Sequence, residues 1–242
     1  MTFLRRSCFQ LSGLILLSSV AVNAAPLMAQ ASVKDPTATS ILAAAKTSLA
    51  KESGVHVKVV TFAGKVDSTL IADIGRESGS EAYVSGNETF TITVTPTHAY
   101  LSGSATGLTK LMGLSSAEQK MIGKASMSMN KGTKEFTTFH SDMTSGAFAQ
   151  LLPVAKGTTL LSKRDKATNG YQLTWTTKAS TSAPKTTTVM IFSSGKATLP
   201  LKDMVNTSNS YSTTTFSKWG EVPKITIPTS TITYDKVFGI KG

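Results

Sequence analysis

Apolar and polar residues alternate along most of the chain from Val55 onward. Val55, Val57 and Val59 are separated by polar residues, and the same alternation recurs over residues 88–95, where threonines separate the apolar positions. A period of two is typical of β-strands that bury one face. The pattern therefore predicts a sheet that is apolar on one side and polar on the other.

Turn-forming residues, such as Gly64 and the pair Asn169-Gly170, divide this pattern into two groups of strands. The first group is expected from Val55 and then at 66–74, 81–85, 88–95 and 100–103. The second group is expected at 158–162, 171–177, 186–192, 198–205 and 210–218. Together the strands can form one antiparallel meander.

Between the two groups the apolar residues take a helical spacing, which predicts three short helices. Gly113 can end the first, and Ser115 with Glu118 has the sequence of a capping box for the second. Ser141 can start the third, which Pro153 stops. The apolar positions are Leu108, Leu111 and Met112 in the first helix, Met121, Ile122 and Ala125 in the second, and Met143, Ala147, Phe148, Leu151 and Leu152 in the third.

A longer helix precedes the strands. Asp35-Pro36 has the sequence of an N-cap followed by a proline in the first turn, and the helical spacing continues to Gly54. Its apolar positions are Ile41, Leu42, Ala45 and Leu49. The sequence thus predicts an α+β fold, in which one antiparallel sheet carries this N-terminal helix and the short helices.

Residues 1–31 have the features of a secretory signal peptide. Two arginines precede an apolar run at 11–22, and small-residue cleavage signals end at Ala24 and Ala31. The run is shorter than the ~20 residues that cross a bilayer. We therefore expect an exported protein of the periplasm, cell envelope or extracellular space, folded as a single domain over residues 32–242.

Cys8 is the only cysteine of the chain, and it lies within this signal, ahead of the apolar run. A lipid-anchoring cysteine would directly follow the run. We therefore expect the exported chain to have no disulfide and no lipid anchor.

The exported chain is basic. Without the two arginines of the signal, 23 of the 25 basic residues remain against 14 acidic ones, which gives a net charge of +9. Such an excess can favour an anionic membrane surface. The lysines are spread singly and no nucleic-acid recognition motif is present, so a solvated basic surface is expected and nucleic acid is not.

The sequence offers no constellation for catalysis. His56, His98 and His140 are scattered without metal-ligand spacing, and no Gly-x-Ser-x-Gly motif or phosphate-binding glycine loop occurs. We expect neither enzyme activity nor a metal or other cofactor.

Two passages resemble the LppX and LprG-like envelope lipoproteins of actinobacteria. The end of the chain, from Phe216 through Trp219-Gly220 to Pro228, is similar to their closing strand, Trp-Gly pair and proline. The passage Tyr100-Leu101-Ser102-Gly103, running into the short helices, is similar to their mid-chain segment. The match covers most of the exported chain in the order of its elements.

This resemblance implies a strongly curved antiparallel half-barrel, related in shape to the LolA carriers, with helices on its concave face around an apolar cavity for acyl chains. The chain departs from the family in two places. It has no cysteine at the signal junction, and Met127-Ser128-Met129 stands where a tryptophan-bearing strand is expected.

Two functions remain open at this point. The first is a non-catalytic carrier or binding protein for a lipid or another apolar small molecule in the cell envelope. The second is a secreted structural or interaction protein whose concave face is packed core without a ligand cavity. For the carrier, the predicted lining residues are Val57, Val59, Phe90, Ile92, Leu108, Leu111, Met112, Met121, Ile122, Phe148, Leu151 and Leu152.

The signal peptide gives the first testable prediction. The exported protein should begin near Ala25 or Ser32 and carry no acyl group, because the cleavage signals lie there and the cysteine lies upstream. Intact-mass measurement of the secreted form checks both points. A mass that includes a diacylated Cys8 would refute them.

Overall fold

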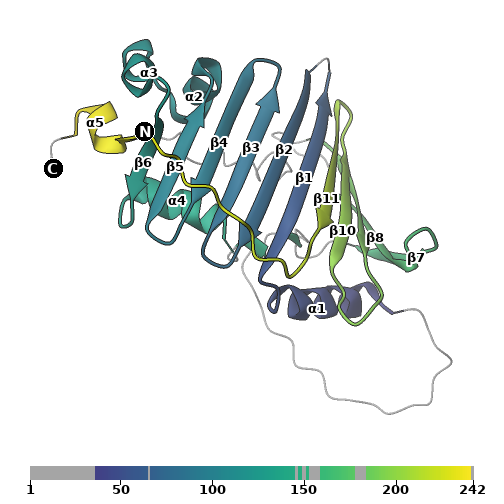
Figure 1. Cartoon of the computed structure of the whole chain (residues 1–242). Coiled ribbons are helices and arrows are strands. Elements are labelled where there is room, and N and C mark those ends of the chain that lie inside the picture. Colours follow the sequence, from purple (N-terminus) through teal and green to yellow (C-terminus); the bar gives the residue numbers. More distant parts are fainter. Residues whose placement is uncertain are drawn as a thin grey trace.

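Figure 1 shows the computed structural model of the protein, an open and curved sheet of twelve strands with helices packed against it. The structure describes residues 36–64, 66–144, 147–148, 151–152, 159–177 and 184–240. The predicted signal peptide lies outside the described residues. The predicted α+β class, with a curved and almost entirely antiparallel sheet, is confirmed.

The elements follow each other in two strand-rich halves separated by helices. The described helices are α1 (Ala38–Leu49), α2 (Ala105–Met112), α3 (Ser116–Ile122), α4 (Lys134–Asp142) and α5 (Tyr234–Phe238). The described strands are β1 (Gly54–Ala63), β2 (Val66–Gly75), β3 (Gly79–Ser85), β4 (Glu88–Val94), β5 (His98–Gly103), β6 (Ser126–Asn130), β7 (Leu161–Asp165), β8 (Gly170–Thr177), β9 (Thr186–Phe192), β10 (Pro200–Asn206), β11 (Ser210–Ser217) and β12 (Thr231–Thr233). None of these helices combines the length and the hydrophobicity needed to cross a bilayer.

The sheet consists of two meanders joined side by side, not the single meander expected from the sequence. Its strand order is β12-β6-β5-β4-β3-β2-β1-β11-β10-β9-β8-β7. The last strand of the second meander, β11, pairs antiparallel with the first strand of the first meander, β1. Strand β12 then returns to the far edge and pairs parallel with β6. A local pattern does not encode such long-range pairing, which explains the error.

The alternation of apolar residues sets the buried face of the sheet. Val55 and Val57 of β1 are buried, as are Phe90, Ile92 and Val94 of β4. The helices contribute side chains to the same hydrophobic cluster, namely Leu49, Leu108, Ile122, Phe136 and Phe139. Burying each such side chain stabilises the fold by about 1.5–3 kcal/mol. The helices therefore cover the apolar, concave face, as predicted.

A second, smaller cluster lies under α1. Ile41 and Ala45 of this helix pack with buried residues of β8 and β9. Those strand residues are Leu173, Trp175, Met190 and Phe192. Helix α1 thus reaches both clusters, because Leu49 at its C-terminal end belongs to the larger one.

The predicted signals for the first two short helices are confirmed. Helix α2 ends at Gly113, whose φ of 72° places it in the left-handed region that glycine adopts easily. At α3, the Ser115 side chain accepts a hydrogen bond from the Glu118 backbone N–H, and the Glu118 carboxylate accepts one from the Ser115 N–H. This is the predicted capping box.

The third predicted helix is wrong. Ser141 does not begin a helix but lies in the last turn of α4, which begins after the N-cap Thr133. The Thr133 hydroxyl accepts a hydrogen bond from the Phe136 backbone N–H, at 3.1 Å. Of the later positions, Ala147, Phe148 and Leu151 lie in tight 3₁₀ geometry, and Pro153 lies outside the described residues.

The start of α1 and one strand also differ from prediction. Helix α1 has Thr37 as its N-cap, so the helix begins later than expected from Asp35-Pro36. Met127-Ser128-Met129 forms the middle of β6, with both methionines fully buried on the apolar face. The residue pattern did not predict this strand, whose buried apolar positions hold methionines and no tryptophan.

Glycines at one end of the sheet allow the chain after β11 to pass close to β1 and β2. A Cβ on Gly54 would collide with the carbonyl oxygen of Glu221, and one on Gly75 would lie 2.9 Å from Cδ of Pro223. We predict that Gly54→Ala lowers the free energy of unfolding by about 1–3 kcal/mol through overpacking. Urea denaturation provides the measurement.

Gly195→Ala is the matched control, because a Cβ at Gly195 meets no atom within 4 Å and its φ requires no glycine. It should leave the urea midpoint unchanged. Equal midpoints for Gly54→Ala and the wild type would contradict the close approach of the Glu221 segment.

Candidate functional site

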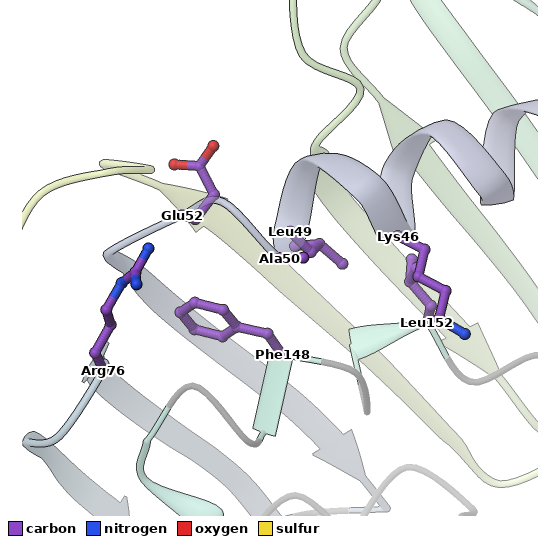
Figure 2. A pocket seen from close by; sticks show the side chains of 7 residues that line it. All are labelled: Lys46, Leu49, Ala50, Glu52, Arg76, Phe148 and Leu152. Atoms are coloured by element: carbon purple, nitrogen blue, oxygen red, sulfur yellow. The ribbon is translucent and has the colours of Figure 1, made fainter.

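A pocket of about 440 Å³ opens at the C-terminal end of α1. Its lining residues are Lys46, Leu49, Ala50, Glu52, Arg76, Phe148 and Leu152. They come from three places in the chain, namely the end of α1 with the turn that follows it, the turn after β2, and residues 148 and 152 (Figure 2).

Hydrogen bonds between distant segments hold the walls of this pocket together. The Arg76 guanidinium donates from Nη2 to the Lys51 carbonyl, at 3.2 Å, which ties the turn after β2 to the end of α1. The Gly220 backbone N–H donates to the Gly54 carbonyl, at 2.9 Å, and the Ser53 hydroxyl donates to the Gly220 carbonyl. The Trp219-Gly220 pair therefore locks the chain after β11 against the turn between α1 and β1.

The floor of the pocket is apolar and firmly supported. Phe148 is only 4% exposed and meets the Trp219 ring edge-on, with 6.0 Å between the ring centroids. The Trp219 indole N–H donates to the Pro200 carbonyl, at 2.9 Å, which fixes the orientation of that ring. Leu152 packs against both hydrophobic clusters. The floor thus lies where the two clusters meet.

Charged side chains surround this floor. Lys46 is exposed on α1, while Arg76 and Glu52 come from the two neighbouring turns. Figure 2 shows Lys46 and Arg76 on either side of Phe148. The pocket therefore combines an apolar floor with a polar rim, the usual composition of a ligand site.

The predicted lining residues fall into four groups. Phe148 and Leu152 line the pocket. Buried in the larger cluster are Val57, Phe90, Ile92, Leu108, Ile122 and Leu151. Partly buried against that cluster are Val59, Leu111 and Met112. Met121 is 49% exposed on α3.

Sequence reasoning did not select the other pocket residues. Leu49 was expected on the apolar face of the N-terminal helix, but Glu52 and Arg76 lie in turns whose local sequence carries no sign of a site. Only the pairing of β1 with its neighbours brings these turns together.

The scattered histidines stay apart. His56 Nδ1 lies 2.7 Å from Asp73 Oδ1, across the β1–β2 pair, while His98 and His140 lie elsewhere in the fold. Within the described ranges, no group of three or more His, Cys, Asp or Glu side chains is arranged to hold a metal ion.

Asp203 is a buried carboxyl on the apolar face of the sheet. It is 6% exposed, its cross-strand neighbours are Thr214 and Met190, and its Oδ1 has no hydrogen-bond partner among the described residues. Burial raises the pKa of Asp203 to about 7, although a hydrogen bond from the Met204 backbone N–H opposes the shift. The sequence did contain a sign of this buried carboxyl, since Asp203 occupies an inward position of an alternating strand.

Among the solved structures that match this chain are two mycobacterial proteins. LprF from Mycobacterium bovis matches with a TM-score of 0.45 and 13% identity, over 78% of this chain and 95% of that protein. LppX from Mycobacterium tuberculosis matches with a TM-score of 0.37 and 13% identity, over 78% of this chain and all of that protein. Both come from the lipoprotein group that the sequence resembles. At this level of similarity, the function of neither protein is carried over to this chain.

Two comparisons of the sequence found no match to this chain. No protein-family profile matches the chain. No curated protein matches it either.

The raised pKa of Asp203 predicts a pH-dependent stability. Between about pH 4 and pH 7 the unfolded chain ionises this carboxyl while the folded chain keeps it protonated, so stability should fall as pH rises. Asp203→Asn cannot ionise, and its advantage over the wild type should grow to about 4 kcal/mol above pH 7. Urea denaturation of both proteins across this range measures the difference.

Asp165→Asn is the control of opposite sign. The hydroxyl of Thr168 lowers the pKa of Asp165, so the wild type should gain stability over this variant as pH rises. A difference between the wild type and Asp203→Asn that does not change with pH would show that Asp203 ionises normally in the folded chain.

Proposed function

We propose that the protein is an exported, non-catalytic carrier or binding protein for a lipid or another apolar ligand of the bacterial cell envelope. The observation that carries this proposal is the pocket at the end of α1. Its volume of about 440 Å³ falls within the ~300–1,000 Å³ range of small-molecule sites.

The chemistry of the pocket agrees with an apolar ligand. Leu49, Ala50, Phe148 and Leu152 line it with hydrocarbon. Ala50 is exposed and Leu152 is half-buried, so a ligand that covers these two removes apolar surface from water. Phe148 and Leu152 would touch the ligand directly. We propose that the other predicted lining residues, apart from the exposed Met121, form the wall of the larger cluster behind them.

Features of the sequence support the proposed location of the protein in the cell envelope. The signal peptide supports export, and the net charge of +9 on the exported chain is compatible with contact to an anionic membrane surface from which a lipid could be taken. The absence of a cysteine after the apolar run supports a form without a lipid anchor.

The structural or interaction role is the second candidate, and one observation favours it. Val57, Ile92 and most of the other predicted lining residues pack into a contiguous core. If the pocket never holds a ligand, this core alone would account for the apolar face.

We predict that the wild type binds a fluorescent fatty-acyl probe and that Phe148→Asp abolishes this binding. Phe148 is buried and packs on Trp219, so the substitution also removes core contacts and the free energy of unfolding should fall by about 3–5 kcal/mol. Probe titration with urea denaturation measures both quantities, and native mass spectrometry of freshly purified protein checks for a co-purified ligand.

Met121→Asp is the control, because Met121 is exposed and lies outside the pocket. It should preserve both probe binding and stability. A wild-type protein that is empty after purification and ignores the probe would leave the structural role as the better explanation.

A further inference from the structure

We infer that the outer, convex face of the sheet docks on an anionic lipid membrane through an apolar patch centred on Val60. This inference goes beyond the proposed function, because it assigns a membrane-contact surface and does not depend on a ligand in the pocket. It is carried by the positions of the exposed apolar residues and of the lysines beside them.

Most of the exposed large apolar side chains lie on this outer face. Among the described residues nine such side chains are exposed, and five of them belong to strands of the sheet. The strand pairing places these five on the face opposite to buried core residues such as Val57. They are Phe62, Ile71, Val84, Leu161 and Tyr211.

One row of cross-strand neighbours forms the centre of the patch. It runs across the sheet from β7 to β4, and it holds only apolar residues and threonines. Neighbours in such a row lie about 4.5–5.5 Å apart, so the row is continuous. A contiguous apolar surface, unlike a single exposed residue, marks an interaction site. The row consists of Leu161, Thr174, Val189, Met204, Thr213, Val60, Thr69, Val84 and Thr89.

Two aromatic residues extend the patch on one side of this row. Phe62 of β1 and Tyr211 of β11 are cross-strand neighbours, and both rings are exposed. The Tyr211 hydroxyl accepts a hydrogen bond from the Thr213 hydroxyl, at 2.8 Å, which holds the tyrosine beside the central row. Tyrosine is enriched where proteins meet the interface of a membrane.

Lysines border the row on its other side. Lys58 of β1 and Lys202 of β10 are both cross-strand neighbours of Thr215. Neither lysine has an ion-pair partner within the described part of the chain. Their ammonium groups are therefore available to lipid phosphates beside the apolar row, while their hydrocarbon stems can lie along it.

The carboxylates of this face compensate these lysines only in part. Asp67 lies opposite Phe62, at the edge of the patch. Asp73 lies beyond the lysines, where its Oδ1 is 2.7 Å from Nδ1 of His56. Asp165, at the distant β7 edge, interacts with Lys163 of the same strand. The centre of the patch thus keeps an excess of positive charge.

The chain after β11 adds to both properties of the face. This segment passes close to β1 and β2 and crosses towards β12 (Figure 1). It exposes Val222 and Ile227, which are 73% and 54% accessible. It also carries the exposed Lys218 and Lys224 against one carboxylate, Glu221.

The shape of the face favours a membrane over a second copy of the chain. Strands β1 and β11 lie at the middle of the strand order, so the patch occupies the crest of a convex surface (Figure 1). Two convex faces would touch over a small area, and their lysines would repel each other. A fluid lipid surface can surround the crest and supply phosphates to the lysines.

The test measures co-sedimentation of the exported chain with two kinds of vesicle. One consists of phosphatidylcholine, and the other of equal parts of phosphatidylcholine and phosphatidylglycerol. The wild type should bind the mixed vesicles about tenfold more tightly, because each lysine near an anionic surface contributes about fivefold in affinity and Asp67 opposes them. High salt should reduce the difference.

Substitutions in the apolar patch test the face itself. Phe62→Ser and Val84→Ser should each weaken binding to the mixed vesicles by about three- to tenfold, because less apolar surface enters the lipid. Met121→Ser is the matched control, since Met121 on α3 is 49% exposed, as is Val84, and lies outside the patch. It should leave vesicle binding unchanged.

Substitution of the lysines tests the charge of the partner. Lys58→Gln with Lys202→Gln should bring the affinities for the two kinds of vesicle close to each other. Lys120→Gln, at an exposed position of α3, should keep most of the difference. Equal affinity of the wild type for both kinds of vesicle would overturn the anionic partner.

Titration with the acyl probe and sedimentation velocity of the same proteins separate the remaining outcomes. Vesicle binding that is absent, or that Phe62→Ser and Val84→Ser leave unchanged, would refute this inference, while probe binding would keep the carrier role. Vesicle binding without probe binding would refute the carrier role alone. A wild-type dimer that Phe62→Ser dissociates, without vesicle binding, would assign the face to self-association and overturn the membrane contact.

Discussion

The pairing of β1 with β11 is the interaction on which the rest of the structure depends. It joins the two meanders over eight residue pairs, from His56 opposite Ser217 to Ala63 opposite Ser210. Without it, the two halves would each expose an unpaired strand edge and half of the apolar face. The pairing also fixes where the chain leaves β11, which places Trp219-Gly220 against the start of β1. Both the core and the pocket are consequences of this one contact.

The pocket lies at the boundary between the two hydrophobic clusters, which the β1–β11 pairing brings together without uniting them. Cross-strand contacts carry the larger cluster from β6 to Phe216 of β11, and the smaller one occupies β8 and β9 beneath α1. Helix α1 crosses this boundary, with Ile41 in the smaller cluster and Leu49 in the larger one. On the strand between the clusters, the inward position is filled by Asp203 in place of an apolar residue. A buried carboxyl there costs stability when it ionises, so this boundary between the clusters becomes less stable as pH rises.

The sequence predicted those parts of the fold whose signals are local. The glycine that ends α2, the capping box of α3 and the alternation of β1 and β4 each act within a few residues, and each is found where expected. Strand β6 was missed because Met and Ser have little strand preference, and it is held by pairing with β5. The three residues of β12 are too few for any period to be read. Helix α4 was misplaced because Ser141 and Thr133 are equally plausible caps when read locally.

The difference between local signals and long-range strand pairing also explains how little of the site could be predicted. Phe148 and Leu152 were selected because they lie on an apolar stripe, and stripes identify core as readily as they identify a ligand floor. What separates floor from core is the polar rim, and Arg76 and Glu52 reach it only because strand pairing places their turns beside α1. Their role depends on register and not on neighbouring residues in the chain. A one-residue slip of β1 against β2 would reverse the face of every side chain on the strand and dismantle this rim, leaving a core with no opening for a ligand.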